Sequence, residues 1–283
     1  MSEPPPPLAA LRLRLRACEE EPRALARLLR ALGADSRGGA RALADVAARR
    51  LEAARRERRR LAALFARRRA LLRAGARAVA GVDEVGMGPL AGPVVAAAVV
   101  LPERVELPGL DDSKRLPAPV RERLAAAIHA QALAVGVAEL WPAEIDRRNI
   151  YRAGLEAMRR AVAALAVAPD HVLVDARTIP ELAMPQTRIV GGDALDGSIA
   201  AASVVAKVHR DALMVRLDAE YPGYGFARHK GYATASHLAA LRRRGPSPMH
   251  RRSFAPVSQL TLAFGDEAPY GDGVALMNDE RSR

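Results

Sequence analysis

The chain has 283 residues, 50% of them hydrophobic, and a formal net charge of +12. This length is sufficient for a sizeable core, and no apolar stretch reaches the roughly 20 residues that a membrane-spanning helix needs. Cys18 is the single cysteine, which excludes an internal disulfide and favours a reducing compartment. The start, Met1-Ser2-Glu3 and four prolines, lacks the order of a secretory signal. We expect a cytoplasmic monomer.

Residues 1–78 are expected to form a basic helical extension. After a disordered, proline-rich start at 1–7, the segment 8–74 consists largely of Ala, Leu and Arg, which favour helix, with a glycine-containing break at 33–39. This extension contains 20 Arg and 8 acidic residues, so the whole net charge lies in it, 20 − 8 = +12. Such an arm favours contact with nucleic acid, and a solvated arginine-rich face is the equal alternative.

From residue 79 onward, short apolar runs and helical patterns predict an α/β catalytic domain that spans 79–258. The expected strands are 79–84, 92–101, 131–140, 171–176 and 187–191. The expected helices are 117–130, 142–167, 198–220 and 234–244. Early strands with little helix between them, followed by alternation, predict a mixed sheet flanked by helices. Residues 259–283 are expected to be a flexible tail.

Three of the expected strands end in, or just before, acidic residues. These are Asp83 with Glu84, then Asp175, and finally Asp193. Carboxylates at strand ends can converge on one edge of an α/β sheet, where their mutual repulsion and burial would raise their pKa values. Bound divalent cations relieve this cost, and carboxylate oxygens suit the two-metal arrangement of phosphodiester chemistry. We therefore expect these four residues to form a catalytic metal site.

A glycine-rich turn, Gly86-Met87-Gly88, follows the first acid pair. Its backbone groups can approach a ligand closely because no bulky side chain intervenes. The alternative that this turn leaves open by itself is an ordinary tight turn beside a solvated acid pair.

Lysine is rare in this chain and is confined to segments that resemble binding sites. Only three of the 44 basic residues are lysine, namely Lys114, Lys207 and Lys230. A compact ammonium and a planar guanidinium are not equivalent in a crowded site. Lys230 and Tyr232 lie in an aromatic and basic loop, where a cation can contact phosphate and a ring can stack on a base or sugar.

Other catalytic classes find little support. The histidines show no metal-ligand spacing, no thiolate set for zinc exists, and the Gly-x-Ser-x-Gly elbow of α/β hydrolases is absent from the sequence. Ser203 lies inside the long helix at 198–220, where its spacing favours packing over catalysis. The patch His250-Arg251-Arg252 is expected to be a phosphate contact or a solvated turn.

These segments together resemble the bacterial ribonuclease HII family, in the family's order, over residues 79–258. The motifs are Gly81-Val82-Asp83-Glu84-Val85-Gly86, Asp112-Ser113-Lys114, Leu173-Val174-Asp175, Gly192-Asp193, Ser198-Ile199-Ala200-Ala201-Ala202-Ser203, Ala206-Lys207-Val208, Tyr221-Pro222-Gly223-Tyr224-Gly225-Phe226, His229-Lys230-Gly231-Tyr232 and His250-Arg251-Arg252-Ser253-Phe254. The extension resembles the helical extension of some members only in general character.

The resemblance implies an RNase H-like fold with a five-stranded sheet, and cleavage of RNA in RNA–DNA hybrids. It also implies Mg²⁺ or Mn²⁺ as cofactor and cleavage on the 5′ side of ribonucleotides embedded in duplex DNA, leaving 5′-phosphate and 3′-hydroxyl ends. The catalytic and metal-binding residues that it implies are Asp83, Glu84, Asp175 and Asp193. The substrate-binding candidates are the backbone of Gly86, Met87 and Gly88, the phosphate-contacting Lys114, the junction-sensing Tyr232, and Ser203, Lys207 and Lys230. Asp211 matches a motif but is expected to be structural.

One departure from the family concerns Met87, which stands where the family normally has arginine. Without the guanidinium of that arginine, the chain loses a charge-assisted hydrogen bond to a nearby phosphate, which corresponds to about 1–3 kcal/mol. Two alternatives therefore stay open. One is the specificity of ribonuclease HIII, which would cut hybrids but not single ribonucleotides, and the other is a catalytically weakened nucleic-acid-binding protein.

Overall fold

The computed structural model describes residues 6–18 and 21–264, with side chains described as far as residue 260. The chain divides into two compact units, Met1–Leu64 and Phe65–Arg283. No helix in the described ranges is both long and apolar enough to cross a membrane.

The first unit is built from three helices around a leucine-rich core. They are α1 (Leu8–Ala17), α2 (Pro22–Gly33) and α3 (Gly38–Leu64). The core side chains are Leu11, Leu15, Leu25, Leu28, Leu32, Ala40, Ala47 and Leu51. Most arginines of this unit are exposed, so its charge lies outward, as an amphipathic helical pattern dictates. A role in contacting nucleic acid stays a prediction.

The boundary between the units comes earlier than the expected join at residue 78. Helix α4 (Ala66–Arg73) belongs to the second unit because the residues around it pack there. The ring of Phe65 lies against Gly197. The buried guanidinium of Arg68 donates to the carbonyl of Leu101 at 2.7 Å.

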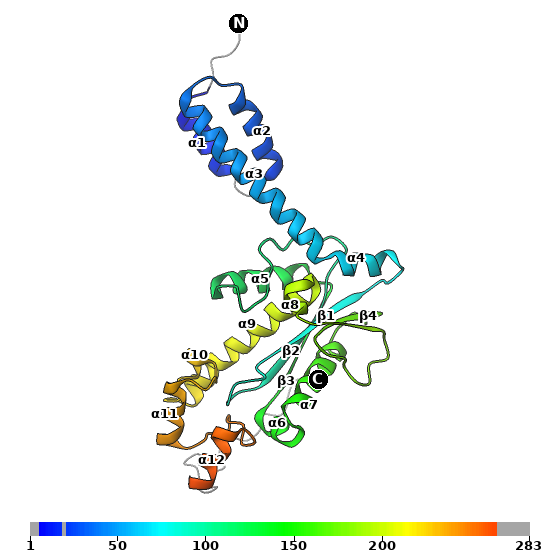
Figure 1. The fold of residues 1–283 in the computed structure, drawn as a ribbon, viewed down its shortest axis with the longest axis vertical. Helices are drawn as coiled ribbons and strands as arrows, with labels where there is room; N and C mark the ends of the chain where they lie inside the picture. Colours follow the sequence, from blue (N-terminus) through cyan, green and yellow to red (C-terminus); the bar gives the residue numbers. More distant parts are fainter. Residues whose placement is uncertain (1–5, 19–20, 265–283) are drawn as a thin grey trace, which may run out of the picture. The chain divides into compact units, whose positions relative to one another are not determined.

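The second unit contains the mixed five-stranded sheet that the sequence predicts. Its strands are β1 (Val79–Val85), β2 (Val94–Val100), β3 (Ala134–Leu140), β4 (His171–Asp175) and β5 (Gln186–Ile189), in the order β3-β2-β1-β4-β5 (Figure 1). Strand β1 pairs antiparallel with β2 and parallel with β4. It is therefore the central strand, and its carboxyl end lies beside that of β4.

Helices cover both faces of this sheet. Helix α9 (Gly197–Glu220) packs along one face of β1 and β2, and α7 (Ile150–Ala163) packs on β2 and β3 (Figure 1). The core beneath α7 includes Val82, Val94, Val174, Met158 and Val162. The helix expected at 142–167 is divided into α6 (Pro142–Arg148) and α7. The cause is Asn149, which adopts φ 69° and caps α7 by accepting from the Arg152 backbone N–H.

The described part of the second unit contains five further helices. They are α5 (Ala118–Gln131), α8 (Gly192–Leu195), α10 (Phe226–His229), α11 (Ala235–Arg244) and α12 (Ala255–Phe264). Because α12 continues to Phe264, the tail expected from residue 259 does not begin there. The rest of that expected tail, 265–283, lies outside the described residues.

Candidate active site

The carboxyl ends of β1 and β4 bring two of the expected carboxylates together. The parallel register pairs Val82 with Val174, so the next positions are Asp83 and Asp175. Side chains alternate along a strand, which places Asp83 on the same face as Gly81, the face that contacts α9. Glu84 follows on the opposite face.

Asp193 joins this edge through a turn that follows β5. Gly191 adopts φ 67°, a left-handed conformation that glycine accepts without strain, and α8 begins at the next residue. The backbone N–H of Gly192 donates to Asp175 Oδ1 at 2.6 Å. This bond fixes Asp175 beside the residue that precedes Asp193.

Burial and like charge disfavour ionisation of three of these carboxylates, those of Asp83, Glu84 and Asp175. Burial, followed by the charge of Glu84, raises the pKa of Asp83 well above its usual value. Burial also raises the pKa of Glu84, with Asp175 adding to the effect and Arg177 opposing it. The pKa of Asp175 is raised by burial and by the charge of Asp193, although the Gly192 N–H lowers it. The carboxylates therefore lie close enough to interact electrostatically.

Two cationic side chains of the chain lie among these carboxylates. The ammonium of Lys114 donates to Asp193 Oδ2 at 2.9 Å. Burial opposes the charge on Lys114, but the bond to Asp193 and the nearby acids outweigh it, so its pKa is raised. Arg177 Nη1 lies 3.5 Å from Glu84 Oε1. Each cation partly neutralises one carboxylate.

The donor set fits hard divalent cations, although the ligands are not gathered. Glu84 Oε2 is buried and has no hydrogen-bond partner in the described part of the chain. Oxygen ligands are those that Mg²⁺ and Mn²⁺ prefer. Among the described residues no three His, Cys, Asp or Glu side chains surround a common point. Binding of a cation would therefore require these carboxylates to turn toward a common point, away from the ion pairs of Asp193 with Lys114 and of Glu84 with Arg177.

Ser203 is buried, as its spacing in the helix predicts, but it also has a polar role. Its hydroxyl is hydrogen-bonded to the Asp83 carboxylate, which lowers the pKa of that group against the effect of burial. Ser203 Oγ also lies 2.9 Å from Ser113 Oγ. Ser203 is only 4% exposed, which favours a role in positioning Asp83; its expected contact with substrate stays a prediction.

Two buried arginines, Arg251 and Arg210, pack against the glycine turn, a role that the sequence did not predict for them. Arg251 donates to the carbonyls of Gly86 at 2.6 Å and Met87 at 3.1 Å. Arg210 donates to the carbonyl of Pro93 at 2.9 Å. Burial lowers the pKa of Arg251 to about 9. The expectation of a phosphate contact or solvated turn is therefore wrong for Arg251, because its guanidinium is fully buried and bonded to carbonyls.

Tyr232 lies next to the glycine turn and is accessible. A side chain at Gly88 would meet the Tyr232 ring at 3.9 Å, and the ring is 43% exposed. The Leu90 N–H donates to the carbonyl of Gly231 at 2.8 Å. This bond joins the two loops, so Tyr232 and the turn face the same space.

The other two lysines, Lys207 and Lys230, form hydrogen bonds with residues close to them in the sequence. Lys207 Nζ donates to Asp211 Oδ1 at 2.7 Å, and Asp211 also pairs with Arg121 at 3.5 Å. Asp211 thus has the structural surroundings expected of it. The ammonium of Lys230 donates to the carbonyl of Ala227. In the described part of the chain these bonds join the two lysines to Asp211 and Ala227 and not to the four carboxylates, so their substrate roles stay predictions.

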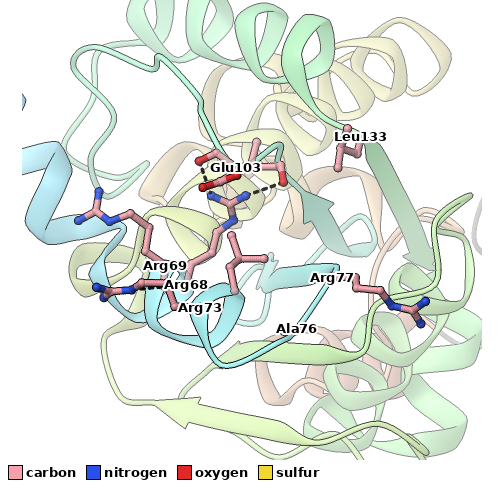
Figure 2. Close-up of a pocket in the computed structure, with 9 residues that line it drawn as sticks. Arg68, Arg69, Arg73, Ala76, Arg77, Glu103 and Leu133 are labelled. Atoms are coloured by element: carbon pink, nitrogen blue, oxygen red, sulfur yellow. Dashed lines mark hydrogen bonds between the residues drawn. The ribbon is translucent and has the colours of Figure 1, made fainter.

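A separate basic recess lies away from all the expected site residues. Its volume is about 530 Å³, and it is lined by Arg68, Arg69, Leu72, Arg73, Ala76, Arg77, Leu101, Glu103 and Leu133 (Figure 2). These residues precede β1 or follow β2, so the recess lies at the opposite end of β1 from Asp83. The guanidinium of Arg68 is already bonded to backbone carbonyls there. We assign no chemistry of the carboxylate site to it.

The mixed sheet with carboxylates at neighbouring strand ends defines a nuclease of the RNase H-like class. Comparison with known proteins agrees. The family model for Ribonuclease HII matches residues 80–257. The Ribonuclease HII of Myxococcus xanthus is 57% identical over 233 residues, which cover 82% of this chain and 80% of that protein. That of Geobacillus thermodenitrificans is 60% identical over 181 residues, or 64% and 70% of the two chains.

A solved structure gives the same result for the fold. The ribonuclease H2 from Pyrococcus horikoshii OT3 superposes with a TM-score of 0.58 at 26% identity, over 66% of this chain and 98% of that one. The chain belongs to the ribonuclease HII family. It is therefore an endoribonuclease of the ribonuclease H type, a class that acts on RNA–DNA hybrids.

Proposed function

We propose that this chain is a metal-dependent ribonuclease HII that cuts RNA in hybrids and also cuts 5′ of single ribonucleotides in duplex DNA. The proposed reaction is two-metal hydrolysis that leaves 5′-phosphate and 3′-hydroxyl ends. One observation supports it above all others. Burial first, and then the charges of neighbouring carboxylates, raise the pKa values of Asp83, Glu84 and Asp175 at the carboxyl ends of β1 and β4. A fold gains nothing from such repulsion, whereas a catalytic site uses it.

Asp83, Glu84, Asp175 and Asp193 would hold Mg²⁺ or Mn²⁺. When bound, such cations lower the pKa of an attacking water and neutralise charge that develops at the scissile phosphate. Ser203 holds the Asp83 carboxylate in place for this role. The Gly192 N–H does the same for Asp175.

Substrate would be oriented by the groups around the carboxylates. Lys114, whose side chain is 73% exposed beside Asp193, would bind a phosphate oxygen with its ammonium. The backbone of Gly86, Met87 and Gly88 would recognise the ribose hydroxyl. Tyr232 would stack on the sugar or base at the junction, because aromatic faces bind nucleotides in this way.

Met87 favours a second candidate, the specificity of ribonuclease HIII. Its thioether offers no charge to phosphate, so cleavage of single ribonucleotides would be weaker than cleavage of continuous hybrids. A pure nucleic-acid-binding role is disfavoured, because binding alone requires no cluster of buried carboxylates.

The test is cleavage in Mg²⁺ of two labelled substrates, a continuous RNA–DNA hybrid and a DNA duplex with one ribonucleotide. We expect the wild-type chain to cut both, the second on the 5′ side of the ribonucleotide. Asp83→Asn should slow both reactions by more than roughly 100-fold, because loss of a group that merely orients a metal ligand already costs about 10–100-fold.

Asp45→Asn is the matched control, because Asp45 is exposed and lies in the first unit. Equal rates for wild type and Asp83→Asn would refute the mechanism. Cleavage of the hybrid alone would identify the second candidate.

A further inference from the structure

We propose that Arg177 is a substrate-binding residue that contacts a phosphate of the nucleic acid from the space beside Met87. The contact would supply the cation that the glycine turn lacks. This inference rests on the proposed function, and it names a residue that the sequence motifs did not single out. The ligand class is the phosphodiester backbone of the hybrid or duplex.

The backbone turns Arg177 toward the carboxylates immediately after β4 ends. Ala176 adopts φ 51°, an uncommon conformation for a residue with a Cβ. Its N–H donates to the carbonyl of Ile189 at 2.8 Å, so β5 holds this turn in place. Non-glycine residues in this conformation are concentrated at active sites and ligand-binding segments. Here it places a guanidinium two residues after a candidate metal ligand.

Arg177 and Met87 occupy the same small space. A Cβ at Gly154 would lie 2.9 Å from Arg177 Nη1 and also 2.9 Å from Met87 Sδ. Gly154 belongs to α7, so this glycine leaves room for both side chains at the edge of the sheet. A charge at position 177 is therefore adjacent to the turn that holds Met87.

The guanidinium is held in position with hydrogen-bonding capacity left over. Its Cζ lies 5.0 Å from the ring centroid of Tyr151, within the range of a cation–π contact. Its Nη1 lies 3.5 Å from Glu84 Oε1, is buried, and has no hydrogen-bond partner among the described residues. A buried donor without a partner is costly, and the fold does not use all the hydrogen-bonding capacity of this side chain; because Nη1 itself is buried, a ligand would approach the exposed part of the side chain.

Phosphate is the ligand that this geometry fits. A guanidinium presents a planar fork of donors that matches two phosphate oxygens. The side chain is 22% exposed, which leaves access from one side. A divalent cation held by Glu84 would weaken the attraction of that carboxylate for Arg177, and the guanidinium would then be available to a phosphate.

The experiment measures binding by fluorescence anisotropy, using a labelled DNA duplex with one ribonucleotide in Mg²⁺. All variants also contain Asp83→Asn, so that the duplex stays intact. The set is Arg177→Met, Arg177→Met with Met87→Arg, and the control Arg104→Met. Arg104 is exposed in the segment after β2, at the far end of the sheet.

We expect Arg177→Met to weaken binding roughly 10- to 100-fold and to reduce the salt slope by about one phosphate contact. Adding Met87→Arg should restore most of the affinity, which also shows that the loss is not a folding failure. Arg104→Met should bind like its parent. The inference is overturned if Arg177→Met matches Arg104→Met in affinity and slope, or if Met87→Arg restores nothing.

Failure of this inference is distinguishable from failure of the proposed function. If Arg177 has no role, the chain without Asp83→Asn still cuts the duplex. If the proposed function is wrong, that chain does not cut the duplex, whatever the anisotropy shows.

Discussion

Gly81 is the residue at which the central strand and the long helix approach most closely. A Cβ there would lie 2.0 Å from the carbonyl carbon of Ser198 and 2.5 Å from the backbone nitrogen of Ile199. Backbone atoms in a packed interior cannot move aside cheaply. The absence of a side chain at Gly81 therefore sets the distance between β1 and α9, and with it the bond between Ser203 and Asp83.

We predict that Gly81→Ala destabilises the protein by about 1–3 kcal/mol or more, the usual cost of overpacking. It should also lower the rate of cleavage, because a displaced α9 moves Ser203 away from Asp83. Urea unfolding measures the first effect. Gly33→Ala is the matched control, since nothing lies within 4 Å of a Cβ at that position. Equal unfolding midpoints for the two variants would contradict this account of the strand–helix contact.

At the residue scale, the acidic residues at the ends of β1 and β4 could be predicted, because the sequence shows both the apolar run of each strand and the acidic residue that ends it. The buried positions of Arg251 and Arg210 could not be predicted, because nothing in the sequence distinguishes an arginine that binds buried carbonyls from one that is exposed to solvent. Arg177 was missed for a related reason. Its role depends on the left-handed turn at Ala176, which no residue type signals.

Three histidines from three segments tie the C-terminal helices together. His229 ends α10, His237 lies in α11, and His250 follows it. His237 Nε2 lies 3.1 Å from His250 Nε2, and His237 Nδ1 lies 2.8 Å from the carbonyl of Tyr232. Burial lowers the pKa of His237 to about 4 and that of His250 to about 3. The cluster thus supports the loop that presents Tyr232.

This cluster should make stability depend on pH. His237 and His250 take up protons near pH 6.5 in the unfolded chain, but only near pH 4 and pH 3 in the folded chain. Their contribution to stability is therefore fully present above pH 6.5 and is lost as the pH falls through that value toward 4 and 3. Lowering the pH from 6.5 to 5 should reduce the free energy of unfolding by about 2 kcal/mol for each of these two residues.

Urea titrations at several pH values measure this dependence. The raised carboxylate pKa values act with the opposite sign, so the histidine share is the difference between wild type and His237→Gln. We expect His237→Gln to flatten the loss between pH 7 and 5, and the exposed His129→Gln to leave it unchanged. Identical pH profiles for His237→Gln and wild type would refute the role of the cluster.

At the element scale, periodicity predicted all five strands and the long helix α9 with bounds close to those observed. Strands β1 to β4 and helix α9 are rich in apolar residues, and α9 also has the N-cap Asp196, whose side chain accepts from the Ser198 N–H. Strand β5 has only Ile189 as an apolar residue. The short helices α8 and α10 were not predicted, because four residues show no helical period. The division at Asn149 was missed because only its backbone conformation reveals it.

The molecule as a whole consists of a basic helical unit and a catalytic unit, each with its own core. The parallel pairing of β1 with β4 brings Asp83 beside Asp175, although 175 − 83 = 92 positions separate them in the chain. A common metal site that also includes Asp193 stays a prediction. The strand pairing itself follows from the α/β topology and could be predicted. The boundary at Leu64 could not be predicted, because the helices on its two sides, α3 and α4, are both rich in Ala, Leu and Arg.

Binding of Mn²⁺ to the full chain, measured by isothermal titration calorimetry, tests the central claim most directly. We predict that the wild-type chain and Asp45→Asn bind Mn²⁺. The double variant with Asp83→Asn and Asp175→Asn should lose this binding, although it should remain folded up to the urea concentration at which the wild type unfolds. Undiminished Mn²⁺ binding by the double variant would contradict the assignment of these carboxylates as the metal site.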